Sequence, residues 1–576
     1  MPAQRHSSFQ RISDNGTFDV IVIGGGINGL GVYRELALQG LRVLLVERND
    51  FCSGCSSAPS RMIHGGLRYL ENGEFDLVRE SLAERDALLR NAPHLVRPLP
   101  TTIPITSLFS GLFNAATSFF GGSGKPSNRG ALPIKAGLSL YDLVTRKRRM
   151  LPKHKFSSAR TTWKQWPNLT RKLLFSATYY DAWISHPERL GLELITDTNR
   201  LAPDSAAVNY AELSVTDGAY SVTDLETGNS HLVTARAVVN AAGAWLDEVN
   251  AHLSPQKTKP KPLVSGTKGS HLILDNPVLL KALDGHMMYF ENTDGRVCIV
   301  FPYLGKVLAG STDIRVTSAS RTRCEPEEMD YILTSLQLIF PDVPVSADEV
   351  VFSYSGIRPL PSSDQDFTGR ISRGHFTHKM DGLVPQFCMV GGKWTTFRAF
   401  AQQTADEVMA ELDHPRKLDT IGQPIGGGAD FPLAAGALEQ ALMAEYSVTL
   451  DRAKHMVTAY GTGARQVLNH CVCYADDQPL EQDCAYTLAE ISFLIRHEYV
   501  VHLSDIVLRR TDLAITGGLN LFLVDALTSL MAKELDWTSS QIDTERRSLL
   551  DELHHFHGVF LTAQSQNSKS RSMECV

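Results

Sequence analysis

The sequence has no long apolar run and no excess of positive charge. No window reaches the roughly 18 uninterrupted apolar residues that a transmembrane helix needs, so we do not expect the chain to span a membrane. The formal net charge is −7, which provides no overall attraction to nucleic acid. We therefore expect a protein that is soluble or peripheral to a membrane, without a nucleic-acid partner.

Cysteines are few, and the N-terminus lacks an apolar core. Nine cysteines in 576 residues do not make a disulfide framework, and reduced thiols in the cytoplasm are the simplest interpretation. The first residues are polar and basic, unlike a secretory signal, and we expect residues 1–17 to be a flexible tail. The segment His470–Cys473 lacks the paired spacing of a zinc site, so no metal is expected.

The clearest functional signal is a glycine-rich turn near the N-terminus. The apolar run Val20–Ile23 predicts a strand that is buried on both faces. Gly24, Gly26 and Gly29 then precede a predicted helix and a second strand that ends at Glu47. In such a turn the glycines allow a tight bend, close approach of a pyrophosphate, and close packing of helix on strand. The pyrophosphate sits at the helix N-terminus, where free N–H groups favour negative charge.

The acid at position 47 restricts the nucleotide. It stands where a carboxylate accepts hydrogen bonds from ribose hydroxyls. This arrangement suits FAD or NAD, whose 2′-hydroxyl is free, and argues against NADP. The turn alone does not separate FAD from NAD.

Several later motifs make the chain similar to the FAD-dependent glycerol-3-phosphate dehydrogenases, which are quinone-linked flavoenzymes. The motifs are His64-Gly65-Gly66-Leu67-Arg68-Tyr69-Leu70, Lys268-Gly269-Ser270-His271, Gly310-Ser311-Thr312-Asp313, Tyr354–Leu360 and Gly391–Arg398. The resemblance runs from about residue 18 to about residue 535. It implies FAD as cofactor, a small-molecule polyol phosphate as substrate, and a quinone as electron acceptor.

The resemblance also implies an α/β fold with an α+β cap. A Rossmann-type FAD-binding domain is expected to interleave with a mixed β-sheet substrate domain of the D-amino-acid-oxidase type, followed by an all-helical C-terminal domain. The expected ranges are 18–425 for the oxidoreductase region (FAD-binding 18–95, 200–262 and 351–415; cap 96–199 and 263–350), 430–560 for the helical domain and 561–576 for a disordered tail. Local patterns predict a β-meander over 211–239 and helices over 326–340, 433–446, 451–460, 488–502 and 519–533.

The family motifs supply a set of candidate site residues. The implied cofactor-binding residues are Gly24, Gly26, Ile27, Asn28, Gly29, Glu47, Ser56, Arg61, Ile63, His64, Ala242, Gly243, Gly392, Lys393 and Thr395. The implied substrate-binding residues are Arg68, Tyr69, His271, Arg358, Arg373 and Thr395. The implied catalytic residues are His271, Arg68 and Lys393.

The chemistry of a polyol phosphate gives these residues roles. Arg358 and Arg373 resemble arginines that bind phosphate, for which the planar guanidinium suits paired hydrogen bonds. His271 is favoured as the base for the hydroxyl proton, because a histidine accepts protons near neutral pH. The alternative is that His271 only hydrogen-bonds the substrate while Arg68 or water takes the proton. Lys393 is expected to stabilise negative charge on the reduced flavin.

Two departures from the family pattern leave alternatives open. Residues 105–149 carry apolar stretches and a basic run, and are a candidate for peripheral contact with the cytoplasmic membrane; a buried helix or a loop insertion is the other interpretation. Ser185–Leu190, with His186–Pro187, replaces a family segment and leaves another polyol phosphate, such as erythritol phosphate, open as the substrate. An oxidase that uses O2 and a flavoprotein without catalysis are further alternatives. The sequence does not indicate an oligomeric state, and a homodimer is left open.

Overall fold

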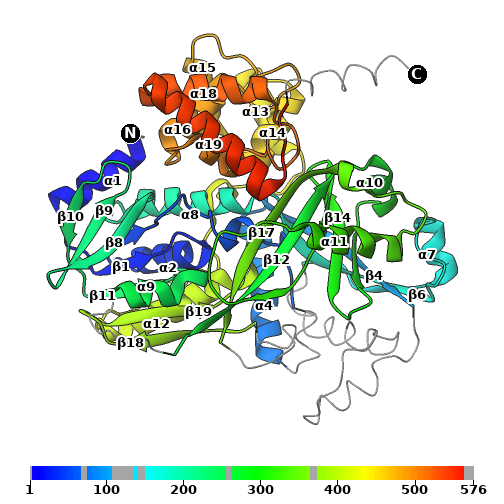
Figure 1. The fold of residues 1–576 in the computed structure, drawn as a ribbon, viewed down its shortest axis with the longest axis horizontal. Helices are drawn as coiled ribbons and strands as arrows, with labels where there is room; N and C mark the ends of the chain where they lie inside the picture. Colours follow the sequence, from blue (N-terminus) through cyan, green and yellow to red (C-terminus); the bar gives the residue numbers. More distant parts are fainter. Residues whose placement is uncertain are drawn as a thin grey trace.

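The computed structural model describes residues 3–66, 74–106, 135, 138, 150–253, 261–362 and 373–562. A parallel sheet and a mixed sheet lie side by side, and a C-terminal helical domain sits over the junction between them (Figure 1). Among the described residues, no helix combines the length and apolarity needed to cross a bilayer.

The parallel sheet contains the strand that precedes the glycine turn. Its strands in spatial order are β18 (His375–Met380), β19 (Gln386–Gly391), β11 (Ala237–Asn240), β1 (Val20–Ile23), β2 (Val43–Val46) and β7 (Ala206–Val208). Pairing is parallel from β19 to β7 and antiparallel between β18 and β19. The predicted burial of the first strand on both faces is confirmed, because its side chains alternate between two hydrophobic clusters.

Helices cover one face of the parallel sheet, and a helix-and-meander layer covers the other. The first face packs against α2 (Ile27–Leu38), α8 (Pro187–Leu201) and α12 (Phe397–Glu411). The second packs against α1 (Ala3–Asp14), α9 (Leu246–Leu253) and the meander of β8 (Ala211–Thr216), β9 (Ala219–Asp224) and β10 (Ser230–Val233). The predicted meander over 211–239 is confirmed as far as Val233, and residues 237–239 lie instead in β11 of the parallel sheet.

The N-terminal segment is ordered, and the prediction of a flexible tail over residues 1–17 is wrong for the described part. α1 packs Phe9 and Ile12 into the core of the parallel-sheet layer. Arg5 is buried, and its Nη2 lies 2.5 Å from Asp224 Oδ1. The polar sequence does not indicate a buried helix, because the acid that pairs with Arg5 lies far along the chain.

The mixed sheet forms the other layer. Its strands in spatial order are β16 (Ile314–Val316), β12 (Val264–Leu274), β15 (Lys306–Gly310), β14 (Val297–Tyr303), β13 (Met287–Glu291), β4 (Val96–Ile105), β6 (Phe175–Ile184) and β3 (Met62–Ile63), with β17 (Val350–Pro361) beside β12 and β5 (Lys155–Ser158) beside β6. One face packs against α10 (Pro277–Leu283) and α11 (Pro326–Ile339), near the short α7 (Ala159–Gln165). The helix predicted over 326–340 is confirmed.

The assignment of segments to the two layers differs from the prediction at three places. β17 pairs along β12 in the mixed sheet, although residues 351–415 were expected in the FAD-binding part. β3 also belongs to the mixed sheet, whereas α8, from the predicted cap segment 96–199, packs on α2. Local patterns predict these elements but not their partners, which tertiary contacts select.

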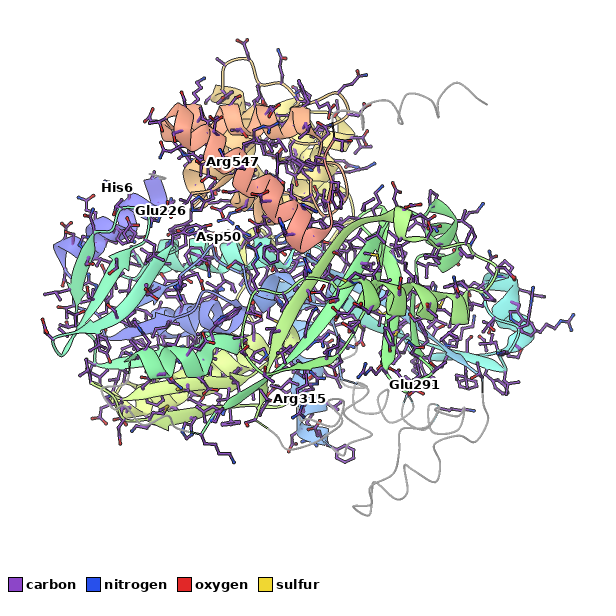
Figure 2. The ribbon with its side chains drawn as sticks, in the orientation of Figure 1. His6, Asp50, Glu226, Glu291, Arg315 and Arg547 are labelled. Carbon is purple, nitrogen blue, oxygen red and sulfur yellow. The ribbon has the colours of Figure 1, made fainter. Side chains whose placement is uncertain are left out.

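The C-terminal domain is helical and contacts both layers. Its elements are α13 (Ala437–Tyr446), α14 (Leu450–Tyr460), α15 (Ala464–Cys473), α16 (Leu488–His497), α17 (Leu503–Asp505), the π-helical turn η8 (Ile506–Arg510), α18 (Leu521–Leu535) and α19 (Ser539–His557). The helices predicted over 433–446, 451–460, 488–502 and 519–533 are confirmed, with shifted ends. Figure 2 places Asp50, in the loop after β2, at the junction of this domain with the parallel-sheet layer.

Candidate functional site

The glycine turn lies between β1 and α2. Gly24 has a φ of +100°, a conformation that residues with a Cβ rarely adopt. A Cβ at Gly29 would lie 1.8 Å from the Gly24 carbonyl oxygen, so only glycine permits this packing. At Gly26, the N-cap of α2, an added Cβ would meet only Ser56 Oγ among the described atoms, at 3.2 Å. The first N–H groups of a helix have no partner within the helix. That of Ile27 donates to Ser56 Oγ, and those next to it are the ones that fit a phosphate.

Glu47 closes β2 and contacts the glycine turn. Its Oε2 accepts a hydrogen bond from the Gly25 N–H at 2.6 Å, and its Oε1 accepts one from the Asn49 N–H at 2.8 Å. Burial raises the pKa of Glu47, and these backbone donors offset part of that effect. The acid is thus fixed beside the turn, where a ribose hydroxyl would meet it.

A second glycine pair approaches the turn from β19. Gly391 and Gly392 have φ values of +83° and +99°, and a Cβ at Gly392 would lie 2.5 Å from Asn28 Nδ2. Asn28 donates to the Gly391 carbonyl at 3.3 Å. Its buried Oδ1 has no hydrogen-bond partner within the described part of the chain. A buried acceptor of this kind is normally satisfied, so a bound group with a donor fits here.

The carboxyl ends of β1 and β11 bring the remaining cofactor candidates to the same crevice. A Cβ at Gly24 would lie 2.7 Å from the Ala241 carbonyl oxygen, and Ala242 and Gly243 follow directly. Ser56 Oγ accepts from the Ile27 N–H at 2.9 Å. Because open α/β sheets bind ligands where strand order reverses, this geometry fits a dinucleotide such as FAD.

Arg61 is one cofactor candidate that the structure places in a different environment. Its Nη1 donates to the Ser185 carbonyl at 3.2 Å and its Nη2 lies 3.3 Å from Glu188 Oε1. The guanidinium also lies over the rings of Tyr303 and Tyr354. A buried ion pair therefore engages this side chain, and any cofactor contact from this position falls to its backbone.

The departure at His186–Pro187 begins helix α8. His186 is the N-cap and Pro187 occupies the first turn, a position that tolerates proline. Glu188 pairs with Arg61 in the interior, and Arg189 forms a buried ion pair with Glu498 of the C-terminal domain. In this structure the segment joins the layers to the helical domain.

Lys393, His64 and Thr395 meet on the other side of the crevice. Thr395 Oγ1 accepts from the His64 N–H at 3.2 Å, next to Ile63 of β3. Lys393 Nζ donates to Ser81 Oγ of α4 (Phe75–Asn91) at 2.8 Å. Burial lowers the pKa of Lys393 to about 7. Burial and the Lys393 charge lower the pKa of His64 to about 3, so His64 is neutral.

The sequence analysis did not identify Glu80 or Asp181 as site residues. Burial raises the pKa of Glu80 to about 7 against the nearby Lys393 charge. Asp181 Oδ1 accepts from the Gly65 N–H at 2.8 Å and from Arg85 Nη1 at 3.1 Å, which fixes the start of the His64-Gly65-Gly66 motif. In the sequence, Glu80 is one acid on the polar face of a predicted helix, and Asp181 ends the triplet Tyr179-Tyr180-Asp181. Neither pattern is specific to a functional site.

Arg358 and Arg373 share one carboxylate. Arg358 Nη1 lies 3.0 Å from Asp313 Oδ1, and Arg373 Nη2 lies 3.5 Å from Asp313 Oδ2. Arg358 also donates to Ser311 Oγ at 3.1 Å. The structure thus brings together the two arginines predicted to bind phosphate, and it adds Asp313 as the residue that orients them.

His271 lies on β12 between Gly310 of β15 and Tyr354 of β17. Its ring stacks on Tyr354 with centroids 5.0 Å apart. Both ring nitrogens are buried and lack a hydrogen-bond partner among the described residues. Burial, then the charges of Arg358 and Arg61, lower the pKa of His271 well below its usual value. A neutral imidazole with free nitrogens can accept a proton.

Some candidates lie outside the described residues. These are Arg68 and Tyr69, together with the segments 107–134, 136–137 and 139–149 of the proposed membrane-contact region. In the described part of the chain, no group of three or more His, Cys, Asp or Glu side chains is placed to hold a metal ion.

Comparison with known families matches nearly the whole chain. Residues 19–407 match the family of FAD dependent oxidoreductases, and residues 418–542 match the C-terminal domain of alpha-glycerophosphate oxidase. The second match covers most of the C-terminal helical domain.

Individual relatives carry a consistent name. The chain is 33% identical to a glycerol-3-phosphate dehydrogenase of Synechocystis sp., over 92% of this chain and 95% of the relative. It is 30% identical to the mitochondrial glycerol-3-phosphate dehydrogenase of Schizosaccharomyces pombe, over 94% and 88%. The solved glycerol-3-phosphate dehydrogenase of Bacillus halodurans, complexed with FAD, shares the fold with a TM-score of 0.72 at 23% identity, over 96% of this chain and 98% of that one. The chain therefore belongs to the glycerol-3-phosphate dehydrogenases of the FAD-dependent oxidoreductase family.

Proposed function

We propose that this protein oxidises sn-glycerol 3-phosphate to dihydroxyacetone phosphate with FAD as hydride acceptor, and that a quinone then takes the electrons. One observation carries the proposal: Arg358 and Arg373 converge on Asp313 beside a buried, neutral His271. Cations for a phosphate and a base for a neighbouring hydroxyl are the two groups that this substrate requires.

The arginines bind and orient the substrate. Asp313 pairs with both guanidinium groups and so holds them next to each other. A phosphate dianion makes paired, charge-assisted hydrogen bonds with guanidinium groups. Thr312, next to Asp313, is fixed to helix α11, because its hydroxyl donates to buried Glu328 at 2.6 Å. This contact supports a phosphate site that is already formed before the substrate arrives.

Proton and charge handling fall to His271 and Lys393. His271 accepts the hydroxyl proton when carbon 2 is oxidised. Burial is the main cause of its low pKa, and a phosphate beside Arg358 would offset the smaller part that comes from that charge. When bound, FAD supplies the two-electron acceptor. Lys393 directly follows the second glycine pair, and its Nζ donates to Ser81 Oγ; its ammonium offsets the negative charge that develops on the reduced cofactor.

The electron acceptor distinguishes two versions of the proposal. If the acceptor is a membrane quinone, the protein attaches peripherally to the cytoplasmic face of the membrane, with residues 105–149 as the candidate contact. Oxygen is the alternative acceptor, and the match of residues 418–542 to an oxidase C-terminal domain favours it. Rapid reoxidation of the reduced protein by O2 supports the oxidase, and reoxidation by a soluble quinone under anaerobic conditions supports the dehydrogenase.

Substrate identity is tested by flavin absorbance. The FAD-loaded protein is mixed anaerobically with glycerol 3-phosphate, with erythritol phosphate, and with free glycerol. We expect the oxidised flavin band to bleach with glycerol 3-phosphate alone. Bleaching only with erythritol phosphate would reassign the substrate, and no bleaching with any phosphorylated polyol would favour a flavoprotein without this catalysis.

Replacing Arg358 with alanine is expected to raise the KM for glycerol 3-phosphate about 10- to 100-fold, since charge-assisted hydrogen bonds to the phosphate are lost. FAD stays bound, because Arg358 contacts the mixed sheet rather than the glycine turn. Steady-state kinetics with a flavin absorbance spectrum measures both effects. Arg296→Ala, in the turn between β13 and β14, is the matched control and should leave KM unchanged. An unchanged KM in Arg358→Ala removes this arginine from the site.

A further inference from the structure

The loop that follows β2 contacts the C-terminal domain as well as the glycine turn. We call residues 47–57 the cradle loop. At its ends Glu47 accepts from the Gly25 N–H, and Ser56 accepts from the Ile27 N–H. Between these ends, Asp50 and Phe51 contact the helical domain. Among the described contacts, no residue of that domain touches the glycine turn directly.

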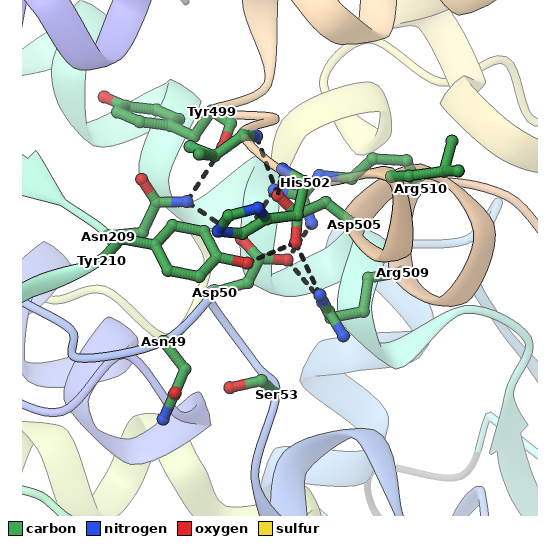
Figure 3. A network of polar contacts seen from close by, with 12 residues as sticks. Asn49, Asp50, Ser53, Asn209, Tyr210, Tyr499, His502, Asp505, Arg509 and Arg510 are labelled. Carbon is green, nitrogen blue, oxygen red and sulfur yellow. Dashed lines mark hydrogen bonds and ion pairs between the residues drawn. The ribbon is translucent and has the colours of Figure 1, made fainter. Parts of the chain in front are cut away.

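Asp50 is the centre of a buried ionic network (Figure 3). Only 1% of the residue is exposed. Arg510 Nη2 donates to Asp50 Oδ1 at 2.9 Å, and Arg510 Nη1 contacts the other carboxylate oxygen. Arg509 Nε donates to that same oxygen at 2.5 Å. Asn209, next to β7, donates to Asp50 Oδ1 at 3.1 Å.

The two arginines are themselves fixed from the C-terminal side. They end the π-helical turn η8, a geometry that is uncommon and is frequent at functional sites. Arg510 Nη2 also donates to the Glu498 carbonyl at 2.8 Å. Arg509 Nη2 lies 2.6 Å from Asp505 Oδ1, which accepts from Tyr210 Oη at 2.6 Å. The helical domain therefore presents a rigid pair of cations to the cradle loop.

Phe51, which follows Asp50 in the cradle loop, is held by packing. Phe51 is 1% exposed, and its ring meets Tyr499 of the C-terminal domain edge-on, with centroids 5.4 Å apart. On the opposite side, a Cβ at Gly25 would lie 2.6 Å from the Phe51 ring. The Cys52 N–H then donates to the Gly25 carbonyl at 2.9 Å. Phe51 is thus wedged between the glycine turn and the helical domain.

We propose that the C-terminal helical domain holds the cradle loop in the shape that receives the adenosine half of FAD, and that Asp50 is the positioning residue through which it does so. Asp50 lies three residues after Glu47, and the intervening Asn49 N–H donates to the Glu47 carboxylate. Holding Asp50 therefore fixes the acid expected to meet the ribose. A loop ordered in advance loses less conformational entropy on binding, which raises affinity.

This inference depends on FAD binding at the glycine turn and not on the identity of the polyol phosphate. The experiment therefore measures FAD retention rather than turnover. A protein that oxidises another substrate would leave the expected result unchanged.

The experiment compares Asp50→Asn with Glu498→Gln in the full-length holoprotein. Both variants weaken a buried ion pair between the C-terminal domain and the rest of the molecule, so both are expected to lower Tm. Only Asp50 belongs to the cradle loop. We expect the FAD Kd, from the fluorescence of released flavin, to rise about tenfold or more in Asp50→Asn and less than about twofold in Glu498→Gln.

A second readout follows the loop without FAD. Amide hydrogen exchange in the apoproteins, measured by mass spectrometry on peptides covering residues 47–57, is expected to accelerate in Asp50→Asn and not in Glu498→Gln. Equal FAD Kd values and equal exchange in the two variants would overturn the proposal.

A milder variant covers the case in which Asp50→Asn does not fold. Arg509→Lys keeps a cation and leaves Arg510 in place. The contact between Asp50 and the helical domain is therefore weakened but not lost. Like Asp50→Asn, this variant should show faster amide exchange over residues 47–57 and a higher FAD Kd, but at a near-normal Tm. Normal FAD affinity and normal exchange in this variant would also contradict the proposal.

Discussion

A His271→Gln variant is expected to lose about 10²–10⁴-fold in kcat while keeping its FAD, because general-base catalysis contributes a factor of this size. His271 is neutral in the free protein, since burial and the charge of Arg358 lower its pKa. Its ring nitrogens are free of protein hydrogen bonds in the described residues. Glutamine retains polarity and approximate length but cannot take a proton.

The competing role for His271 is substrate binding alone. In that case the variant would show a raised KM with a nearly unchanged kcat, which is the outcome that contradicts the base assignment. Anaerobic single-turnover bleaching of the flavin separates the two, because it reports the oxidation step directly. His286→Gln is the control: this histidine hydrogen-bonds Thr102 in the mixed sheet at 3.2 Å and should have normal kinetics.

A Lys393→Met variant is expected to lose about 10²–10³-fold in kcat, the usual effect of removing one group that stabilises developing negative charge. Methionine fills a similar volume without the ammonium. The flavin midpoint potential should fall as well, because the reduced, more negative state loses a nearby cation. Potentiometric titration of the bound flavin detects this shift, which a packing defect alone would not produce.

The pH dependence of this effect follows from the pKa of Lys393. Burial lowers that pKa to about 7, so the lysine is charged at about pH 6 and largely neutral at about pH 8.5. The ratio of wild-type to Lys393→Met rates should be largest at the lower pH and shrink as pH rises through about 7. Lys393→Arg, which stays charged, should restore part of the rate and flatten this dependence. A ratio that is constant with pH would exclude a role for the ammonium charge.

The glycine turn and the acid beside it were predictable because their contacts are local. Gly24, Gly29 and Glu47 lie within a short stretch, and the spacing required by the turn is visible in the sequence. The hydrogen bond from the Gly25 N–H to Glu47 confirms that spacing. Burial of Val20–Ile23 on both faces of the strand was predictable for the same reason.

Residues that act through long-range contacts were not predictable in this way. Asp313 is part of a quoted motif, but its role depends on arginines 45 and 60 positions later. The Arg5 partner is 219 positions away, and the Asp50 partners are 459 and 460 away. A sequence pattern shows that such residues are charged, but only the folded chain shows which opposite charge they meet.

The order of strands in the parallel sheet has a consequence for how the protein is made. β1 leaves the ribosome early, yet one of its neighbours is β11, and the strand beyond that is β19. Neither can pair until hundreds of residues have been synthesised. The mixed sheet waits as well, because its β17 ends only at Pro361. Apolar strand edges therefore remain uncovered through most of translation, a state prone to aggregation, and we expect the nascent chain to depend on chaperones until both layers close almost together.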